Sequence, residues 1–290
     1  MRVILARVRR VLLATAAIVV FLVLAGATYQ GAATALERRQ FRHPGRLVDA
    51  GGHQLHIYCV GEGLPTVVLE APATGMSAAW GWVQPEVARV TRVCGYDRTG
   101  LGWSEAGDRP YQPSAVAGEL HTLLQRAGES GPYVLVGQGL GAAFAALFAA
   151  QFGSDVAALV LVDPPAPDPA LERTPMMRLV NASPWLARIG VLRASHLMSG
   201  NAAAGLPDLS AGALGAFLNR PDHLTRAATE LSRWDETVGL AVGAAIDAGI
   251  TVVRVEAAGR EHDALLTDAG QARRASDAIG GAVGSVRAQQ

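Results

Sequence analysis

The sequence contains no lysine, and its 25 basic residues, all arginines, balance 25 acidic residues to a formal net charge of zero. A chain without net positive charge lacks the general attraction to polyanions, so we expect no nucleic-acid partner. Its two cysteines, without clustered histidines, do not predict a metal site, and we expect no other cofactor. The 290 residues, half of them hydrophobic, are enough to bury one large core.

The N-terminus carries a long stretch without charge. Residues 1–10 include four arginines, and the nineteen residues from 11 to 29 contain no charged residue. Such a run has about the length of one bilayer crossing. We therefore predict a cytoplasmic Arg-rich end, a transmembrane anchor at 11–29, and a main domain outside the cytoplasm. A signal peptide is the alternative, because residues 25–27 (Ala-Gly-Ala) resemble a cleavage site, and the domain would then be secreted.

After an expected linker at 30–45, short β-branched apolar runs alternate with helical stretches. Several runs are apolar throughout, as expected for a mostly parallel sheet with helices on both faces. Residues 46–290 are therefore predicted to form one α/β domain. Within it, residues from about 164 to 234 are rich in Pro, Ala and Leu without a convincing strand, which predicts a helical cap inserted over the sheet.

One junction between a predicted strand and a predicted helix has the spacing of a nucleophile elbow, G-x-S-x-G. Residues 137–141 read Gly-Gln-Gly-Leu-Gly, so Gly139 stands where the catalytic serine would be. Glycine has no side chain, and the amide of the preceding Gln138 is not an activated nucleophile. The sequence therefore predicts an elbow turn that lacks the nucleophilic hydroxyl group.

Four separated motifs follow one another along the chain. They are the loop after Glu70, the run Y-D-R-x-G-x-G-x-S at 96–104, the elbow at 137–141, and L-V-D-P at 161–164. Together they resemble α/β-hydrolase-fold proteins, especially membrane-anchored bacterial members of the esterase and lipase type. The resemblance covers residues 46–165 closely and the remainder loosely, and it implies the α/β-hydrolase fold with a helical cap.

The resemblance also implies a place for each catalytic group. The nucleophile position is Gly139, the candidate base is His262, and the candidate acid is Asp163 at the end of the sixth strand. His262 has the alternative interpretation of a surface loop histidine, and Asp163 that of a helix cap or a loop anchor. Asp97 in the Y-D-R motif is expected to be structural, binding backbone donors at a strand end.

Two departures from the family pattern accompany the missing serine. The oxyanion hole would use the N–H groups of Leu140 and Ala73, but Pro72 stands where relatives usually carry a glycine, and proline restricts the backbone there. Relatives also have two strands after the cap, the seventh with a carboxylate and the eighth with the histidine. Only residues 250–259 are a clear strand here, so one strand is lost or unrecognisable.

The two cysteines fit an exported chain, although composition alone leaves open a disulfide or two buried thiols. In the fold that the chain resembles, the second strand lies beside the fourth, and Cys59 and Cys94 fall within these two strands. The resemblance therefore implies a disulfide between them, with Cα atoms about 4.4 to 6.8 Å apart.

Three functions are compatible with these observations. The first is a membrane-anchored, catalytically degenerate protein with a hydrolase fold, that is, a pseudoenzyme. The second is an active ester or acyl hydrolase with a relocated nucleophile, for which Ser77 and Ser104 are the nearest serines by family position. The third is a module that binds a small apolar or acyl ligand between sheet and cap. We favour the first, because the nucleophile, the oxyanion loop and one strand all depart from the family pattern.

Overall fold

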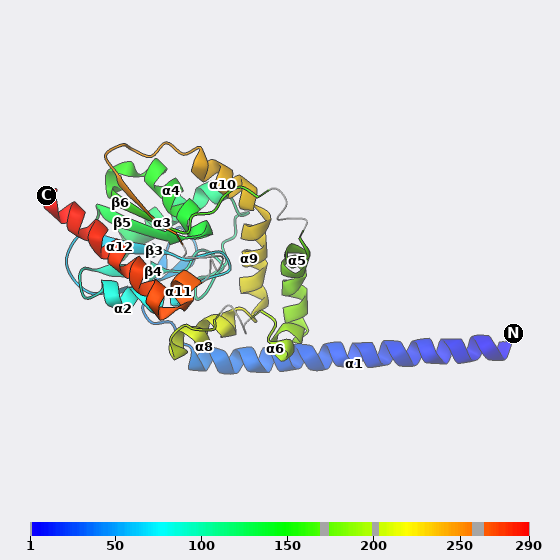
Figure 1. Ribbon diagram of the computed structural model, residues 1–290. Coiled ribbons are helices and arrows are strands. Elements are labelled where there is room, and N and C mark those ends of the chain that lie inside the picture. The colour runs from blue at the N-terminus through cyan, green and yellow to red at the C-terminus, as the bar shows by residue number, and fades with distance from the viewer. Residues whose placement is uncertain (1, 169–173, 199–202, 257–263, 290) are drawn as a thin grey trace.

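The computed structural model describes residues 2–168, 174–198, 203–256 and 264–289. Its centre is a seven-stranded sheet with the order β1-β2-β4-β3-β5-β6-β7 (Figure 1). The β1–β2 and β2–β4 pairs are antiparallel, and the other pairs are parallel. The strands are β1 (Arg46–Asp49), β2 (Gln54–Val60), β3 (Thr66–Glu70), β4 (Val93–Tyr96), β5 (Tyr133–Gln138), β6 (Val156–Val162) and β7 (Thr251–Val255).

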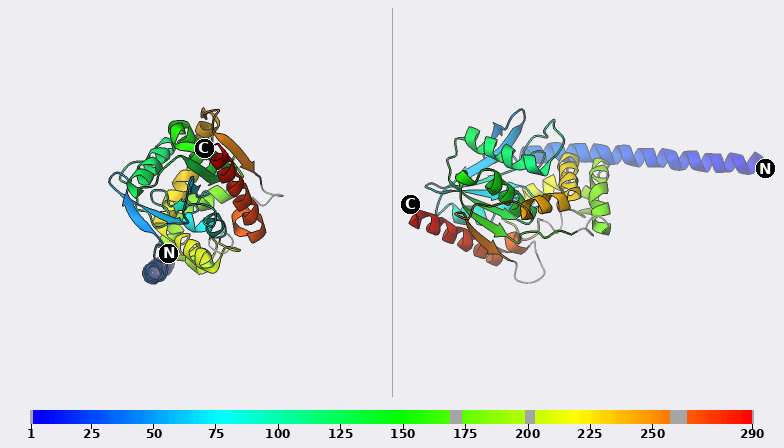
Figure 2. Two further views of the ribbon diagram at one scale, coloured as in Figure 1. Left: turned by 90° about the vertical axis from the view of Figure 1, so that its left-hand side faces the viewer. Right: turned by 90° about the horizontal axis from the view of Figure 1, so that it is seen from above.

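Helices cover both faces of the sheet, as the uninterrupted apolar strands predict. One face packs against α3 and α4, on which α10 lies, and the other packs against α2 and α12 (Figures 1 and 2). The predicted mostly parallel α/β architecture is therefore confirmed. The helices of these layers and the short turns between them are η1 (Ser77–Trp80), α2 (Val83–Val87), α3 (Pro113–Ala127), α4 (Leu140–Gln151), η2 (Gly153–Asp155), α10 (Trp234–Val242), α11 (Ala264–Thr267) and α12 (Ala269–Ala288).

A group of helices lies between β6 and α10, and the described residues of this part contain no strand. It lies over the carboxyl ends of the strands, because α9 binds the loops that follow β3 and β4. We call these helices the cap. They are α5 (Pro175–Arg188), α6 (Val191–Ser195), α8 (Asp208–Phe217) and α9 (Pro221–Ser232).

The sheet ends at β7, which pairs with β6 in parallel. This strand occupies the seventh position of the expected order, and within the described residues no further strand pairs with its free edge. The next long helix, α12, packs beside α2 on one face of the sheet. One strand–helix unit of the family pattern is thus absent from the described part of the chain, between β7 and α12.

The N-terminus forms one continuous helix, α1 (Arg2–Gln40), that projects far beyond the domain (Figure 1). Its Ile4–Gln40 portion is long and apolar enough to cross a membrane, judged by length and composition. The segment 30–45 was expected to be a linker, but it is helical as far as Gln40. The helical part of this segment contacts the cap, which its own sequence does not reveal.

The C-terminal part of α1 docks on the cap through a buried cation. The Arg193 guanidinium of α6 pairs with the Glu37 carboxylate and donates to the Gln30 side-chain oxygen. Gln30 in turn donates to the Asn219 carbonyl at 2.7 Å. These contacts hold residues 30–37 of α1 in a fixed position on the domain.

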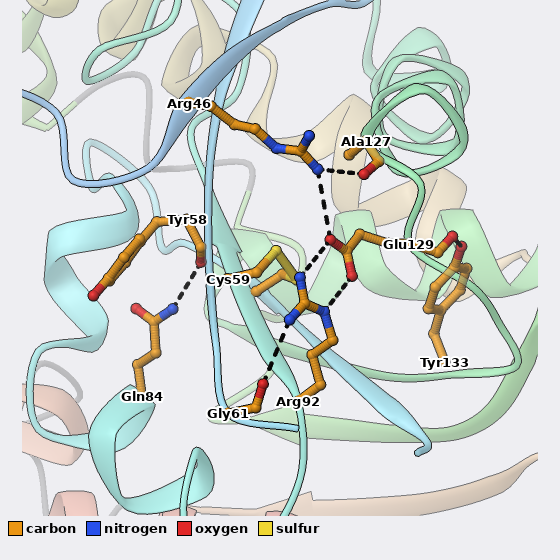
Figure 3. The surroundings of a disulfide bond; sticks show 10 residues. Arg46, Tyr58, Cys59, Gly61, Gln84, Arg92, Ala127, Glu129 and Tyr133 are labelled. Carbon is orange, nitrogen blue, oxygen red and sulfur yellow. Dashed lines mark hydrogen bonds and ion pairs between the residues drawn. A yellow bond between two sulfur atoms is a disulfide. The ribbon is translucent and has the colours of Figure 1, made fainter. Parts of the chain in front are cut away.

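Cys59 and Cys94 lie directly opposite each other in the antiparallel β2–β4 pair, and a disulfide joins them (Figure 3). Their Cα atoms are 4.0 Å apart, closer than the range expected from the resemblance. The Glu129 carboxylate nearby accepts two hydrogen bonds from Arg92, at 2.6 and 2.8 Å, and also pairs with Arg46 (Figure 3). The disulfide therefore lies beside a carboxylate whose charge is already neutralised.

Candidate functional site

The turn between β5 and α4, where the sequence predicts a nucleophile elbow, has Gly139 at its centre. Gly139 follows β5 and precedes α4, with φ 51° and ψ −123°, a conformation that residues with a side chain rarely adopt. A Cβ atom on Gly137 would lie 2.3 Å from the Gly141 carbonyl oxygen, and one on Gly141 would lie 2.5 Å from the Glu70 carbonyl oxygen. These two positions require glycine because the backbones of the strand, the helix and the β3 loop meet there.

Gly139 itself is not crowded. A Cβ atom built there would have no heavy atom within 4 Å outside its chain neighbours. The space for a side chain is thus present, although no side chain fills it. Since the turn holds this residue at positive φ, glycine adopts the conformation without the strain that serine would bear.

Of the other expected catalytic positions, Asp163 lies beside this turn. Asp163 follows β6 directly, and the preceding Val162 carbonyl accepts a hydrogen bond from the Gly139 N–H at 3.0 Å. The structure therefore brings the nucleophile and acid positions to adjacent strand ends. His262 lies outside the described residues, so its role as a base remains a prediction.

The two oxyanion-hole positions also come together. Leu140 is the first residue of α4, where backbone N–H groups have no acceptor within the helix. Ala73 packs against the apolar cluster that contains Leu140. Next to them is a cavity of about 80 Å³, lined by Gln138, Ala73 and Thr74 with leucines of the cap. Such a volume is far below the roughly 300 to 1,000 Å³ of ordinary ligand pockets.

A buried arginine fixes the loop that would form the oxyanion hole. Arg98 donates to the Ala71 carbonyl at 2.7 Å and to the Pro72 carbonyl at 3.2 Å. It also forms ion pairs with Glu70 at 2.6 Å and with Glu230 of α9 at 2.8 Å. One guanidinium thus ties together the end of β3, the following loop and the cap.

The two carboxylates on Arg98 differ in electrostatic environment. Burial raises the pKa of Glu70 to about 7, despite the guanidinium and a hydrogen bond from the Tyr96 hydroxyl. Burial also acts to raise the pKa of Glu230, but Arg98 and Arg226 outweigh it and hold the value below the usual range. Near neutral pH the cluster therefore keeps Glu230 ionised while Glu70 exchanges a proton.

A histidine of the cap holds the same loop. His223 Nε2 lies 2.9 Å from the Thr74 carbonyl oxygen, and the Gly102 N–H donates to His223 Nδ1 at 3.0 Å. A nitrogen that accepts from a backbone N–H is unprotonated, so Nε2 carries the hydrogen and the ring is neutral. Burial lowers the pKa of His223, consistent with this form. The ring therefore acts as a fixed bridge between two loops.

Ser77, a candidate relocated nucleophile, lies beside a histidine and an aspartate but not in a catalytic arrangement. Its Oγ is 3.5 Å from His56 Nδ1, the same nitrogen that lies 3.0 Å from Asp97 Oδ2. A catalytic histidine uses one nitrogen for the carboxylate and the other for the serine. Here the second nitrogen, Nε2, is buried without a hydrogen-bond partner among the described residues.

Asp97 and Ser104 bind backbone groups of the neighbouring loops. Asp97 accepts from the Ser77 N–H at 2.6 Å and from the Trp103 N–H at 2.9 Å. Burial alone would raise the pKa of Asp97, but His56 and these backbone donors hold it below its usual range. The Ser104 hydroxyl donates to the Asp97 carbonyl at 2.6 Å. The expected structural role of Asp97 agrees with this geometry.

A larger cleft adjoins this cluster, since Ser77 and Trp103 line it. It has a volume of about 640 Å³ and lies between the end of α1, β2, η1, α2 and α8. Its walls are mainly apolar and aromatic, with Phe41, Tyr58, Trp103 and Leu209 among them, and Ser77 at its edge. The size is that of a site for a small apolar ligand.

In the described part of the chain, one group of three potential metal ligands lies within 4.8 Å, formed by Cys59, Cys94 and Glu129. These donors do not suit a metal ion, because both sulfur atoms are joined in a disulfide and the carboxylate is bound by Arg92. We therefore assign this group a structural role.

Sequence reasoning missed three residues of this site, namely Arg98, His223 and Glu230. Arg98 is the arginine of the Y-D-R motif, and an arginine directly after an apolar strand could have been predicted to pair with buried carboxylates. His223 and Glu230 are seven residues apart and therefore share one face of α9, a spacing that indicates a common partner.

The family model described as the alpha/beta hydrolase fold matches residues 64–204. The 2-hydroxy-6-oxo-2,4-heptadienoate hydrolase of Pseudomonas putida is 34% identical over 124 residues, which are 41% of this chain and 44% of that protein. A vacuolar membrane protein of Saccharomyces cerevisiae is 31% identical over 135 residues, 40% of this chain and 21% of that protein. This chain spans less than half the length of these curated relatives.

Among solved structures, the Cif epoxide hydrolase of Acinetobacter nosocomialis has a TM-score of 0.67. The sequence identity is 15%, and the match covers 87% of this chain and 96% of that chain. At this identity the likeness concerns the fold alone.

Proposed function

Since this chain has the α/β-hydrolase fold, we propose that it is a membrane-anchored protein of this fold whose elbow does not catalyse acyl transfer. The observation that carries the proposal is Gly139, which occupies the nucleophile position in the nucleophile's backbone conformation and offers no reactive atom. Without a nucleophile, catalysis through a covalent intermediate has no first step.

The surroundings of Gly139 support the same conclusion. The cavity that the described residues form beside it has a volume of about 80 Å³, below that of ordinary ligand pockets. Ser77 shares one imidazole nitrogen with Asp97, so no free base faces its hydroxyl. Ser104 donates to a backbone carbonyl within the Y-D-R loop. Neither serine is activated in the way that a relocated mechanism requires.

The anchor is supported by α1. Its apolar residues 11–24 are exposed, which is costly in water and favourable in a bilayer. The similar vacuolar protein of yeast is a membrane protein by its name. Because residues 1–10 include four arginines, we assign the N-terminal end to the cytoplasm and the domain to the opposite side of the membrane.

The catalytic part of the proposal is tested by assaying purified full-length protein in detergent with activated esters. We expect no initial burst and no steady turnover above a detergent blank, whereas a stoichiometric burst would refute the proposal. The anchor is tested separately by washing membranes with high salt and alkali, which should leave the full-length chain in the membrane fraction. A soluble product that starts near Thr28 would instead establish a signal peptide.

Binding of a small apolar or acyl ligand is a second candidate function, favoured by the 640 Å³ cleft at the end of α1. A ligand that binds only the folded state raises the melting temperature in proportion to its concentration. Medium-chain fatty acids are suitable probes, and stabilisation should disappear when Ala213 in the cleft wall is replaced by tryptophan. An equal shift in wild type and Ala213→Trp would exclude this cleft as the binding site.

A further inference from the structure

Helix α5 forms the end of the domain from which the N-terminal part of α1 projects, and it runs across the axis of α1 (Figures 1 and 2). The two helices meet where α5 ends, because a Cβ atom on Gly26 would lie 2.1 Å from the Ile189 carbonyl oxygen. Gly26 lies near the end of the apolar run 11–29. If α1 is the anchor of the proposed function, on which this inference rests, α5 lies along the surface where that run leaves the bilayer.

The outward face of α5 has the composition of a membrane interface. Trp185 is 71% exposed, and the Arg188 guanidinium lies 4.9 Å above its ring centre. Tryptophan is enriched at the boundary between headgroups and acyl chains. The exposed residues recur at three- and four-residue intervals along the helix and include Arg178, Asn181, Ala182, Trp185 and Arg188.

The charge of this face suits anionic lipids. Helix α5 contains no acidic residue. Within the described residues, neither Arg178 nor Arg188 forms an ion pair with a carboxylate. Each arginine near a negatively charged leaflet is attracted to it. Both guanidinium groups are therefore available to lipid phosphates.

A groove of about 320 Å³ between α5 and α9 adjoins this face. Arg188 and Asn181 contribute hydrogen-bond donors from α5, and a guanidinium can bind two phosphate oxygens at once. The wall from α9 carries three hydroxyl groups, each of which donates to a backbone carbonyl of α9, so the donors of the groove come from α5. The hydroxyl groups are those of Thr225, Thr229 and Ser232.

We propose that the outward face of α5 rests on the bilayer and that the groove between α5 and α9 binds the phosphate of an anionic phospholipid headgroup. Arg178 and Arg188 attract the headgroup, Arg188 and Asn181 bind it, and Trp185 enters the interface beside it. Because α1 and α5 then contact the same leaflet, the domain is held in one orientation on the membrane.

The position of α5 is tested with full-length protein in phosphatidylcholine vesicles whose lipids carry bromine near the headgroup, because bromine quenches nearby tryptophan. Helix α1 contains no tryptophan, so the anchor itself gives no signal. We expect quenching in wild type, its loss in Trp185→Phe, and its retention in Trp82→Phe, a matched change at the start of α2. Equal quenching in wild type and Trp185→Phe would overturn the proposed position.

The preference for anionic headgroups is tested by adding phosphatidylglycerol to the same vesicles. Quenching of Trp185 should increase, the increase should be lost in the double variant Arg178→Gln/Arg188→Gln, and it should persist in Arg273→Gln, an exposed arginine of α12. The same response in wild type and the double variant would refute the phosphate site. A chain released from vesicles by alkali refutes the anchor, whereas a retained chain without Trp185 quenching refutes only this inference.

Discussion

Arg98 Nη2 lies 2.8 Å from Glu230 Oε2, in an ion pair whose two side chains are almost completely buried. Arg98 follows β4 and Glu230 belongs to cap helix α9, so the pair joins the sheet to the cap. A buried charge that loses its partner is strongly destabilising, since neither water nor an opposite charge compensates it. The cap is therefore attached to the sheet by a buried ion pair as well as by apolar packing.

Replacing Glu230 by glutamine should consequently destabilise the fold by up to about 3 to 5 kcal/mol, because Arg98 and Arg226 lose their shared carboxylate and Arg98 keeps only Glu70. Chemical denaturation of the full-length protein in detergent measures this change. Glu236→Gln is the matched control, since Glu236 pairs with Arg233 at the surface and its loss should cost less than about 1 kcal/mol. Equal effects of the two substitutions would contradict the role given to the buried pair.

Stability should also depend on pH through Glu70. Its pKa of about 7 lies above its ordinary value of 4.5, so the folded state binds a proton that the unfolded state releases. The stabilisation from this bound proton is complete when the pH is below the ordinary pKa of 4.5, and it is lost as the pH rises through about 7. The unfolding free energy of wild type relative to Glu70→Gln, which cannot titrate, should therefore fall between about pH 5 and pH 8. A constant difference over that range would show that Glu70 does not titrate there.

The disulfide predicts that the purified chain has no free thiol under non-reducing, denaturing conditions. Replacing both Cys59 and Cys94 by alanine should lower stability by about 2 to 4 kcal/mol, because the 35-residue loop is no longer closed in the unfolded chain. Thiol titration and denaturation measure the two effects. Two titratable thiols in the untreated protein would disprove the bond.

At the elbow, Gly139→Ser should lower stability by about 1 to 2 kcal/mol, because serine must adopt a positive φ that glycine adopts freely. The side chain meets no steric obstacle, so the cost reflects backbone conformation. Gly139→Ala is the matched control and should show the same loss without a hydroxyl. We expect neither variant to hydrolyse esters, and a melting temperature at or above that of wild type would contradict the strain argument.

The sequence predicted the strands that carry the site because their apolar runs are long and uninterrupted. Strand β5 and the turn at Gly139 were found where the motif placed them. Strand β1 has four mostly exposed residues without a continuous apolar pattern, so its own sequence does not identify it as a strand. Local patterns thus identify buried elements better than edge elements.

Contacts between distant segments could not be predicted in this way. The contact of α1 residues 30–37 with the cap is made through Arg193, which lies more than 150 residues away from Glu37 in the chain. The bridge from His223 to Thr74 likewise depends on how the cap lies over the strand ends. Both are consequences of tertiary packing, which no local pattern in the sequence contains.

The central claim, that no side chain of this protein acts as an acyl nucleophile, is tested most directly by a fluorophosphonate. The full-length protein in detergent is incubated with the probe, and labelled residues are identified by mass spectrometry. We predict no stoichiometric labelling at any serine, because Gly139 has no hydroxyl and Ser77 faces a histidine nitrogen already bound to Asp97. Stoichiometric labelling that maps to Ser77 or to any other serine would contradict the account.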